Sequence, residues 1–276
     1  MKRVILSTIV CVIAAAPALA DLHYGQVDAR YTAVSPGLAV GIWSSNTNYA
    51  GGTGFWTGVY NLSLSNLKDV PSLSTPPYAG VPDQWEPYLT GSVQSFCIDV
   101  WDLAPAQTKT YDIVPLAQAP DPQSSPSDGM GALRAAYLAE LLGKYWTKAY
   151  LNTGNTTTNN LHAAALQTAV WEIVDEQSQA TENPDPAIWN VSLGQGNFYV
   201  GRTDVANTAN GMLNDIRADR QATPMGDYAA LTSPFLGSDP KTDNFQDYVV
   251  KVPAPAAVLL GFLGLSAAGV KLRRFA

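Results

Sequence analysis

Cysteine and histidine are scarce in this chain of 276 residues. It has two cysteines, Cys11 and Cys97, and two histidines, His23 and His162. Because Cys11 falls in a segment that we expect to be removed, Cys97 is left alone and no intramolecular disulfide can form. One cysteine and two histidines also cannot build a closed zinc site of the usual kind. We therefore expect neither a bound metal nor a cofactor.

Charge is also sparse, and its balance is negative. Charged residues make up 14% of the chain, with 16 basic against 23 acidic side chains and a net charge of −7. Apolar residues reach 46% and aromatic residues 10%, which excludes a disordered chain and a long helical rod. Without its two ends the chain keeps 11 basic and 23 acidic side chains, or −12. Such a surface repels phosphate backbones, so we expect no nucleic-acid partner.

The first 20 residues have the three parts of a secretory signal peptide. Lys2-Arg3 is a basic start, residues 4–16 form an uncharged apolar run, and Ala18-Leu19-Ala20 is a cleavage signal of small residues. The run is shorter than the roughly 20 residues that a membrane span needs. We expect residues 1–20 to be a signal peptide and residues 21–251 to form one extracellular domain.

The last 25 residues, 252–276, form a second tripartite signal. A proline-containing motif precedes an apolar stretch over residues 256–270, and a basic end follows. The order resembles the PEP-type C-terminal sorting signal (PEP-CTERM) of Gram-negative bacteria, with Ala254 where that family usually has Glu. The resemblance implies export, a transient transmembrane helix in the inner membrane, recognition by an exosortase-type enzyme, and release to the cell surface or extracellular matrix. A retained C-terminal anchor is the alternative. The residues of this signal are Val252, Pro253, Ala254, Pro255, Arg273 and Arg274.

Residues 21 to about 112 have the pattern of strands separated by turns. We expect a turn at 34–37, strands at 38–43, 55–62 and 92–101, a loop over 68–91 and a connector over 104–129. Farther on, we expect a hairpin over 189–200 and a last strand at 247–252.

The middle of the chain is helical. Apolar residues at helical spacing predict helices over 131–150, 161–177 and 205–220, with caps at Ser127 or Asp128 and at Asn159 or Asn160. Together these elements predict an α+β fold in one unit, with a β-rich portion of barrel or sandwich type and a helical insertion.

The segment around Cys97 predicts a strand with two distinct faces. Neighbours alternate along a strand, so Phe96, Ile98 and Val100 share the expected core face. Cys97, Asp99 and Trp101 then share the other face. The thiol is therefore expected away from the most apolar face, where an inert buried cysteine would lie.

The second helix carries a glutamine in an unusual position. Thr168, Glu172, Asp175 and Glu176 form a polar arc, which we expect to be solvated. Gln167 lies off that arc, at the margin of the apolar face. A neutral amide in apolar surroundings costs free energy unless it finds hydrogen-bond partners.

A lone exported cysteine and an off-arc helical glutamine are the two halves of an internal thioester. The thiol attacks the carboxamide, ammonia leaves, and the acyl–sulfur bond then reacts with an amine or hydroxyl. Because water destroys such a bond, we expect Trp101 and Trp171 to shield it, with Asp99 and His162 as orienting residues.

The segment Phe96-Cys97-Ile98-Asp99, followed by Leu166 to Glu172, resembles the Cys–Gln thioester domain of bacterial surface adhesins. That family has an aromatic-Cys segment on a strand and a Gln-x-Ala-aliphatic-Trp motif on a helix. It often has Thr before the Gln, where this chain has Leu166. The resemblance implies that Cys97 is the thioester sulfur, that Gln167 is the acyl donor, and that the protein captures amine-bearing or hydroxyl-bearing surface ligands once, without turnover as an enzyme.

Two other interpretations of the same residues stay open. Cys97 and His162 could form the dyad of a cysteine hydrolase, with Asp99 or Asp175 as orienter. Alternatively, Cys97 stays a free thiol in a structural or carbohydrate-binding protein of the extracellular polymer matrix. The acidic series Asp239, Asp243 and Asp247 matches no calcium loop, and we expect a solvated linker there.

Overall fold

The computed structural model describes residues 24–44, 54–68, 83–100, 102–119, 129–175, 186–194, 196, 198–218, 227–233 and 245–252. The expected signal peptide, Trp101 and every residue of the sorting signal except Val252 lie outside these ranges. The capping candidates Ser127 and Asp128 also lie outside them.

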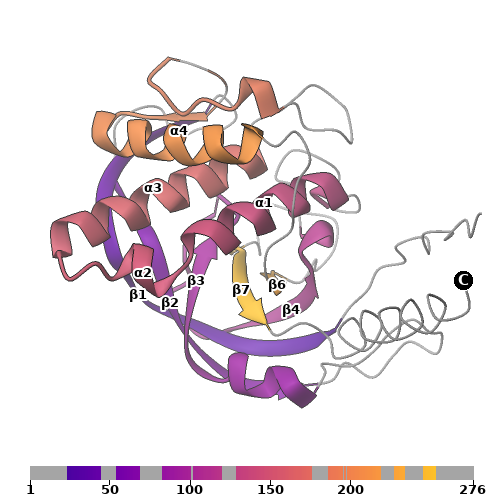
Figure 1. Ribbon diagram of the computed structural model, residues 1–276. Helices are drawn as coiled ribbons and strands as arrows, with labels where there is room; N and C mark the ends of the chain where they lie inside the picture. The colour runs from indigo at the N-terminus through magenta and orange to yellow at the C-terminus, as the bar shows by residue number, and fades with distance from the viewer. Residues whose placement is uncertain are drawn as a thin grey trace, which may run out of the picture.

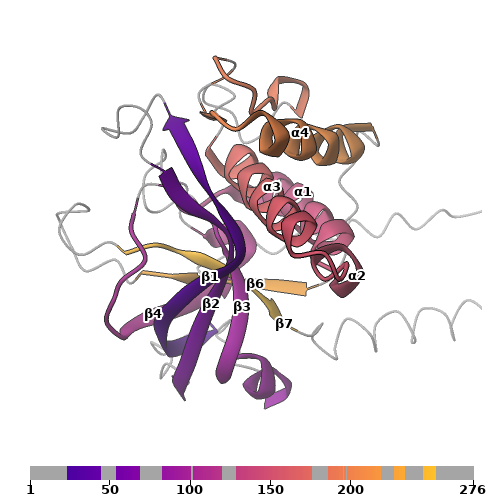
Figure 2. The ribbon, with the colours of Figure 1, turned by 90° about the vertical axis from the view of Figure 1, so that its left-hand side faces the viewer.

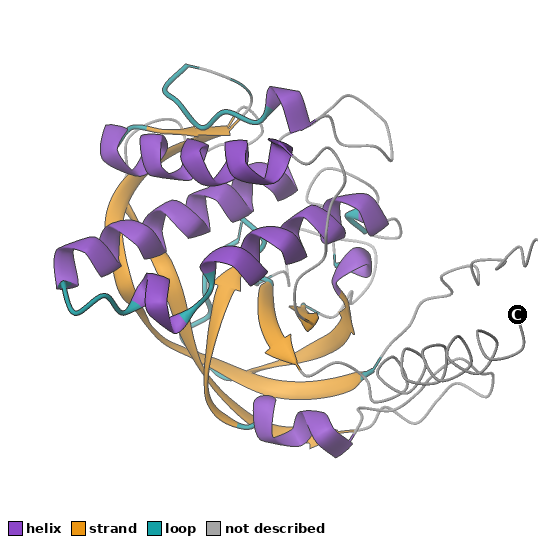
Figure 3. Cartoon of the chain, viewed as in Figure 1, coloured by secondary structure: helices purple, strands orange, loops and turns teal. Residues whose placement is uncertain are grey.

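Strands of the described residues close into an antiparallel barrel. Their order is β2-β3-β7-β6-β4-β1, and β1 pairs again with β2 to close the ring. Short β5 extends the far end of β1 (Figures 1 and 3). The expectation of an α+β fold with a barrel-type β portion is confirmed. The strands are β1 Gly25–Ser44, β2 Gly54–Lys68, β3 Gly91–Cys97, β4 Lys109–Pro115, β5 Phe198–Val200, β6 Asp227–Thr232 and β7 Tyr248–Val252.

Strand β1 is long and curved, and it continues without a break through residues 34–37, which were predicted as a turn (Figure 1). Pro36 follows a cis peptide bond, and the pairing register with β2 shifts between Val34 and Gly37. A proline lacks the N–H that a ladder needs, so the strand accommodates it as a bulge instead of ending. Opposite the bulge, a Cβ on Gly58 would lie 2.3 Å from the Pro36 carbonyl oxygen, so only glycine fits there.

The helices lie together on one side of the strands (Figure 2). The α-helices of this group are α1 Gly131–Tyr145, α2 Lys148–Leu151, α3 Thr156–Asp175 and α4 Thr203–Ala218. Separate from the α-helices, the short 3-10 turns are η1 Asp83–Tyr88, η2 Leu116–Gln118 and η3 Pro186–Ile188. Helix α3 is the central one, since it contacts β1, β2 and β3 as well as α1 and α4. Within the described residues, no helix is both long and apolar enough to cross a membrane.

Helix boundaries differ from the predicted ones where short polar side chains cap the backbone. Helix α3 begins at Thr156, five residues early, because Asn155 Oδ1 accepts the N–H of Thr158 at 3.1 Å. The helix predicted over 131–150 ends at Tyr145. A new turn then starts at Thr147, whose hydroxyl accepts the Tyr150 N–H at 3.2 Å.

Two further expectations were wrong. Strand β4 lies within residues 104–129, which were predicted as a connector, and it pairs with β1 and β6 in the barrel. Strand β6 lies in a segment for which no element was predicted. The predicted hairpin over 189–200 does not form, because β5 pairs with β1 and only one bond, Val200 N–H to the Val191 carbonyl at 3.1 Å, joins its two halves.

Helix α3 is buried on all sides from Ala163 to Asp175, which overturns the expected solvated arc. Thr168, Glu172 and Asp175 are at most 1% exposed, because α4 and the segment after η3 cover that face. Glu172 Oε1 accepts the Asn190 N–H at 2.5 Å, which supplies one of the partners that a buried carboxylate requires.

Candidate functional site at the end of strand β3

Cys97 and Gln167 are in direct contact, although 70 residues separate them. The Cys97 N–H donates to Gln167 Oε1 at 2.8 Å, and Gln167 Nε2 donates to the Cys97 carbonyl at 2.7 Å. This is the pair of bonds that a residue of a neighbouring strand would make. The carboxamide at the margin of the apolar face thus extends the sheet by one residue, and both side chains are fully buried.

The sulfur of Cys97 lies among hydrogen-bonding groups. The thiol donates to the Asp99 carbonyl at 2.7 Å, while Sγ accepts the Asp99 N–H and the Trp171 indole N–H, each at 3.3 Å. Burial raises the pKa of the Cys97 thiol well above its usual range, and the negative charge of Asp99 adds to the rise. The Cys97 thiol is therefore protonated and neutral, and its S–H bond points toward the Asp99 carbonyl.

Phe96 and Cys97 lie on opposite faces as expected, but the predicted extent of the strand and the expected position of the thiol away from the buried side chains were wrong. Strand β3 ends at Cys97 instead of continuing to residue 101. Phe96 packs edge-on against Trp146 with ring centroids 5.0 Å apart, and Cys97 stands in register with Tyr248 on the other face. Since helices cover one side and barrel strands the other, both residues are buried, and so is most of Asp99.

The predicted accessory residues are placed unevenly. Trp171 contacts the sulfur, and Asp99 contacts it through its backbone. His162 does not join them: its Nδ1 lies 2.8 Å from the Tyr150 carbonyl, and its ring stacks on Tyr150 with centroids 4.0 Å apart. Helix α3 turns His162 away because five residues separate it from Gln167.

Asp247 is a buried acid close to this site, not part of a solvated linker as expected. It is 3% exposed, its Oδ1 accepts the Ser233 N–H at 2.6 Å, and its carbonyl accepts the Ile98 N–H at 3.0 Å. Burial raises the pKa of Asp247 to about 8, and the negative charge of Asp102 contributes. Asp247 thus holds a proton at neutral pH. No feature of its sequence neighbourhood distinguished it from the other acids of that series.

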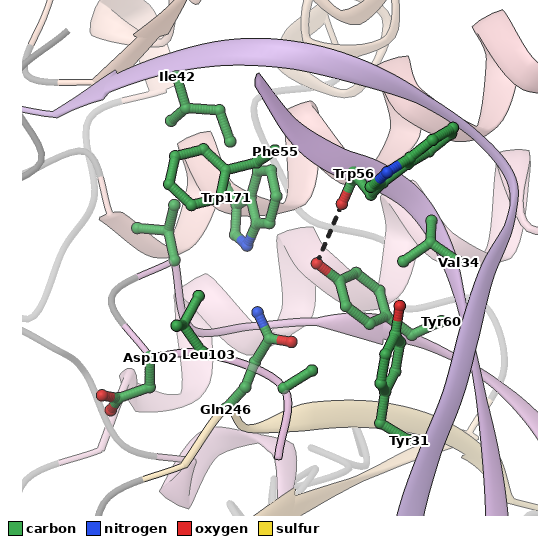
Figure 4. A pocket seen from close by; sticks show the side chains of 12 residues that line it. Tyr31, Val34, Ile42, Phe55, Trp56, Tyr60, Asp102, Leu103, Trp171 and Gln246 are labelled. Atoms are coloured by element: carbon green, nitrogen blue, oxygen red, sulfur yellow. Dashed lines mark hydrogen bonds between the residues drawn. The ribbon is translucent and has the colours of Figure 1, made fainter. Parts of the chain in front are cut away.

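A cavity of about 250 Å³ adjoins the site (Figure 4). Aromatic side chains make up much of its wall, and Trp171 is one of them, so that one indole contacts both the cavity and the Cys97 sulfur. Trp56 and Leu103, each 62% exposed, lie at its solvent side. Sequence reasoning missed this cavity, because its walls come from β1, β2, α3 and the segments next to β3 and β7.

In the part of the chain that the structure describes, no three His, Cys, Asp or Glu side chains come together as ligands for a metal ion. The groups in contact at this site are the Cys97 thiol, the Gln167 carboxamide and the Trp171 indole. Comparison of the chain with protein families, with curated proteins and with solved structures found no match.

Proposed function

We propose that the protein is an exported adhesin of the cell surface or extracellular matrix that captures its target covalently through a thioester between Cys97 and Gln167. One observation carries the proposal. The carboxamide of Gln167 is held by two hydrogen bonds against the residue that bears the thiol, at a fully buried position. The acyl carbon and the sulfur belong to residues that are already in contact, which favours an intramolecular acyl transfer over one between molecules.

Formation of the bond balances without any other reactant. The Cys97 sulfur attacks the carboxamide carbon of Gln167, a C–S bond forms, and the C–N bond breaks. The thiol proton leaves with the amide nitrogen as ammonia. The Cys97 N–H already donates to Gln167 Oε1, so it is placed to stabilise negative charge that develops on this oxygen.

The surroundings of the sulfur suit storage of a reactive bond. Cys97 and Gln167 have no exposed surface, and Trp171 is 2% exposed. Hydrolysis requires water at the acyl carbon, so burial slows it. Capture then transfers the acyl group once to an amine or hydroxyl of a surface protein or polysaccharide. The adhesin acts once per molecule and is not an enzyme in the sense of turnover.

The location in this proposal rests on the two ends of the chain. Residues 1–20 support export, and residues 252–276 support transient attachment to the inner membrane and processing by an exosortase-type enzyme in a Gram-negative bacterium. Both segments lie outside the described residues, apart from Val252, which ends β7.

A non-covalent matrix protein is the second candidate, and one observation favours it. Both polar groups of the Gln167 amide are satisfied by the Cys97 backbone, so the pair also works as a purely structural clamp with a free thiol. A Cys–His hydrolase has no such support, since His162 bonds to Tyr150 and the Cys97 sulfur bonds to Asp99 and Trp171.

The intact mass of the purified protein, prepared in amine-free buffer, tests the proposal. A thioester lowers the mass by one ammonia, and methylamine then adds its own mass and releases one thiol. Cys97→Ala and Gln167→Ala must both abolish the deficit. Alkylation of the native protein does not separate the two candidates, because a buried neutral thiol is as unreactive as a thioester.

Peptide mass spectrometry separates a bond that never formed from one that has hydrolysed. Hydrolysis of the thioester leaves a glutamate at position 167, whereas an unreacted chain keeps the glutamine. A full native mass with glutamine at position 167, together with one thiol that alkylates only after denaturation, would sink the covalent proposal.

A further inference from the structure

The cavity beside Trp171 contains a buried acceptor that lacks a partner. Gln246 is 5% exposed, and its amide points into the cavity toward Tyr60 and Tyr31 (Figure 4). Its Nε2 donates to the Asp99 carbonyl at 3.4 Å, but its Oε1 has no hydrogen-bond partner among the described residues. A buried acceptor left unpaired costs free energy, so this oxygen favours a ligand that brings a hydrogen-bond donor.

The wall around this acceptor is aromatic and attracts cations. Rings of Tyr31, Phe55, Trp56, Tyr60 and Trp171 line the cavity. Aromatic faces attract an ammonium group, and several of them around one site are a known arrangement for binding it.

The charge of the lining points the same way. Asp102 lies at the edge of the cavity beside Leu103 (Figure 4), and none of the described lining residues is basic. The whole chain carries an excess of acidic over basic side chains. A positively charged ligand is therefore complementary to the cavity both locally and at long range.

We propose that this cavity binds a primary alkylammonium group, such as the end of a lysine side chain, with the nitrogen at Gln246 Oε1 among the rings and the alkyl chain along Trp56 and Leu103. This deepens the proposed function, because the cavity selects an amine over a hydroxyl as the target, but the non-covalent binding does not itself require the thioester.

The position of Trp171 connects this binding to capture. Its indole lines the cavity and donates to the Cys97 sulfur at 3.3 Å. The Trp171 side chain therefore lies between the bound amine and the acyl group. After the ammonium gives one proton to water, its nitrogen attacks the acyl carbon of Gln167 and the C–S bond breaks. The second proton lost by nitrogen goes to the Cys97 sulfur, which leaves an amide and a free thiol.

A sugar fits these groups less well. A sugar hydroxyl both donates and accepts, and it needs partners of both kinds. The Gln246 amide N–H is already directed at the Asp99 carbonyl, and the Tyr60 hydroxyl donates to the Trp56 carbonyl at 3.4 Å. The buried lining atom without a partner among the described residues is the acceptor Gln246 Oε1, and an ammonium group brings both a donor and a positive charge to it.

Calorimetric titration of hexylamine into the Cys97→Ala protein tests the inference. This variant cannot form a thioester, yet it keeps both hydrogen bonds of Gln167, because these go to the backbone of residue 97. We expect hexylamine to bind at least about tenfold more tightly than 1-hexanol or hexanoate, since only the amine supplies both charge and donors.

Three variants locate the site. Gln246→Leu removes the acceptor and should weaken hexylamine binding by about tenfold. Trp56→Ala removes one wall and should weaken it roughly fivefold. Asp102→Asn should weaken it about threefold. Leu193→Ala, at a loop position 65% exposed, and Glu86→Gln, on exposed η1, are matched controls outside the lining and should leave binding unchanged.

Equal binding of hexylamine and 1-hexanol, no binding of hexylamine, or insensitivity to the variants would each overturn the inference. Should Gln246→Leu fail to fold, Trp56→Ala at its exposed position decides in its place. Failure of the thioester is seen separately, as a full mass of the unmodified protein. Selective hexylamine binding by Cys97→Ala with a full native mass supports the cavity alone, and a mass deficit without selective binding supports the thioester alone.

Discussion

The surroundings of Cys97 and the cavity meet at Trp171, and they differ in solvent exposure and in hydrogen bonding. Toward Cys97 the protein is closed: Cys97 and Gln167 have no exposed surface, and the polar atoms of the Gln167 carboxamide are paired with backbone. Toward the cavity the protein is open: Trp56 and Leu103 are 62% exposed, and Gln246 Oε1 is buried without a partner in the described part of the chain (Figure 4).

Under the proposed function, this difference separates storage of the acyl group from access of the ligand. A reactive acyl group is preserved where water is excluded from it. A ligand is recognised where apolar walls and an unsatisfied acceptor remain available. The Trp171 side chain belongs to both regions, so its replacement should affect both of them. A substitution that lies within one region should affect that region alone.

The largest effect is expected from Gln167→Ala, which opens the closed region. It leaves the buried N–H and C=O of Cys97 unpaired, and each such group costs on the order of 1–3 kcal/mol. We expect a loss of about 3–5 kcal/mol in the free energy of unfolding, measured by urea denaturation. Cys97→Ala keeps both backbone bonds to Gln167 and loses the weaker bonds that the sulfur makes with Trp171 and Asp99, so it should cost less. Equal losses in both variants would show that the amide is not the structural clamp described above.

The next effect is a pH dependence set by Asp247. Its folded-state pKa, about 8, lies above the ordinary value of an unfolded aspartate, so the folded protein binds the proton more tightly. The contribution of Asp247 to the stability of the folded protein is therefore greatest below about pH 4, and it falls as the pH rises toward 8. We expect a loss of roughly 2.5 kcal/mol between pH 5 and pH 7, measured by urea denaturation at each pH.

Asp247→Asn should flatten this dependence, because an amide imitates the protonated acid and still accepts the Ser233 N–H. Asp204→Asn is the control. Asp204 is exposed and paired with Arg202, which lowers the pKa of its carboxyl, so its removal should leave the fall between pH 5 and pH 7 in place. An unchanged slope in Asp247→Asn would mean that another group is responsible.

A smaller effect is expected where the two regions meet. Trp171→Phe keeps an aromatic ring but removes the N–H that donates to the Cys97 sulfur. We expect a loss of about 1–2 kcal/mol in unfolding free energy from lost packing and one bond. If the thioester is present, we also expect its hydrolysis, followed by intact mass, to become faster.

Trp189→Phe provides the matched control for Trp171→Phe. Trp189 is fully buried like Trp171, but its indole nitrogen has no hydrogen-bond partner within the residues described. It should lose a similar amount of packing energy without changing the hydrolysis rate. If both variants accelerate hydrolysis equally, the effect comes from loosening of the core and not from the indole beside the sulfur.

The fold was predictable in class because local patterns are strong in its regular elements. The apolar spacing in α1, α3 and α4 predicted helices, and β-rich segments predicted strands near β1, β2, β3 and β7. Strands β4 and β6 were missed because proline-rich or polar surroundings hide short strands whose pairing partners are distant in sequence. Closure of the barrel depends on these pairings, so it could not be read from any local pattern.

The contact between Cys97 and Gln167 was predictable, but the environment of the two residues was not. Cys97 stood out because it is the one cysteine outside the expected signal peptide, and Gln167 because it lies off the polar arc of its helix. The burial of Glu172 and Asp247 was not predictable, because charge predicts solvent exposure until another element covers the face. Gln246 carried no signal at all, since its importance arises only from the unpaired oxygen and the rings brought around it.

The smallest effect on stability is expected from Trp56→Ala, at the mouth of the open region. Because the Trp56 side chain is 62% exposed, its removal should change the unfolding free energy by less than about 0.5 kcal/mol. Its effect should appear only in ligand binding, and the control Leu193→Ala, exposed to a similar degree, should change neither quantity. A large loss of stability in Trp56→Ala would mean that the mouth of the cavity supports the barrel, and that the open region is part of the same rigid structure as the closed one. Loss of binding without loss of stability would show instead that the two regions are separable, with recognition carried by a surface that the fold does not need.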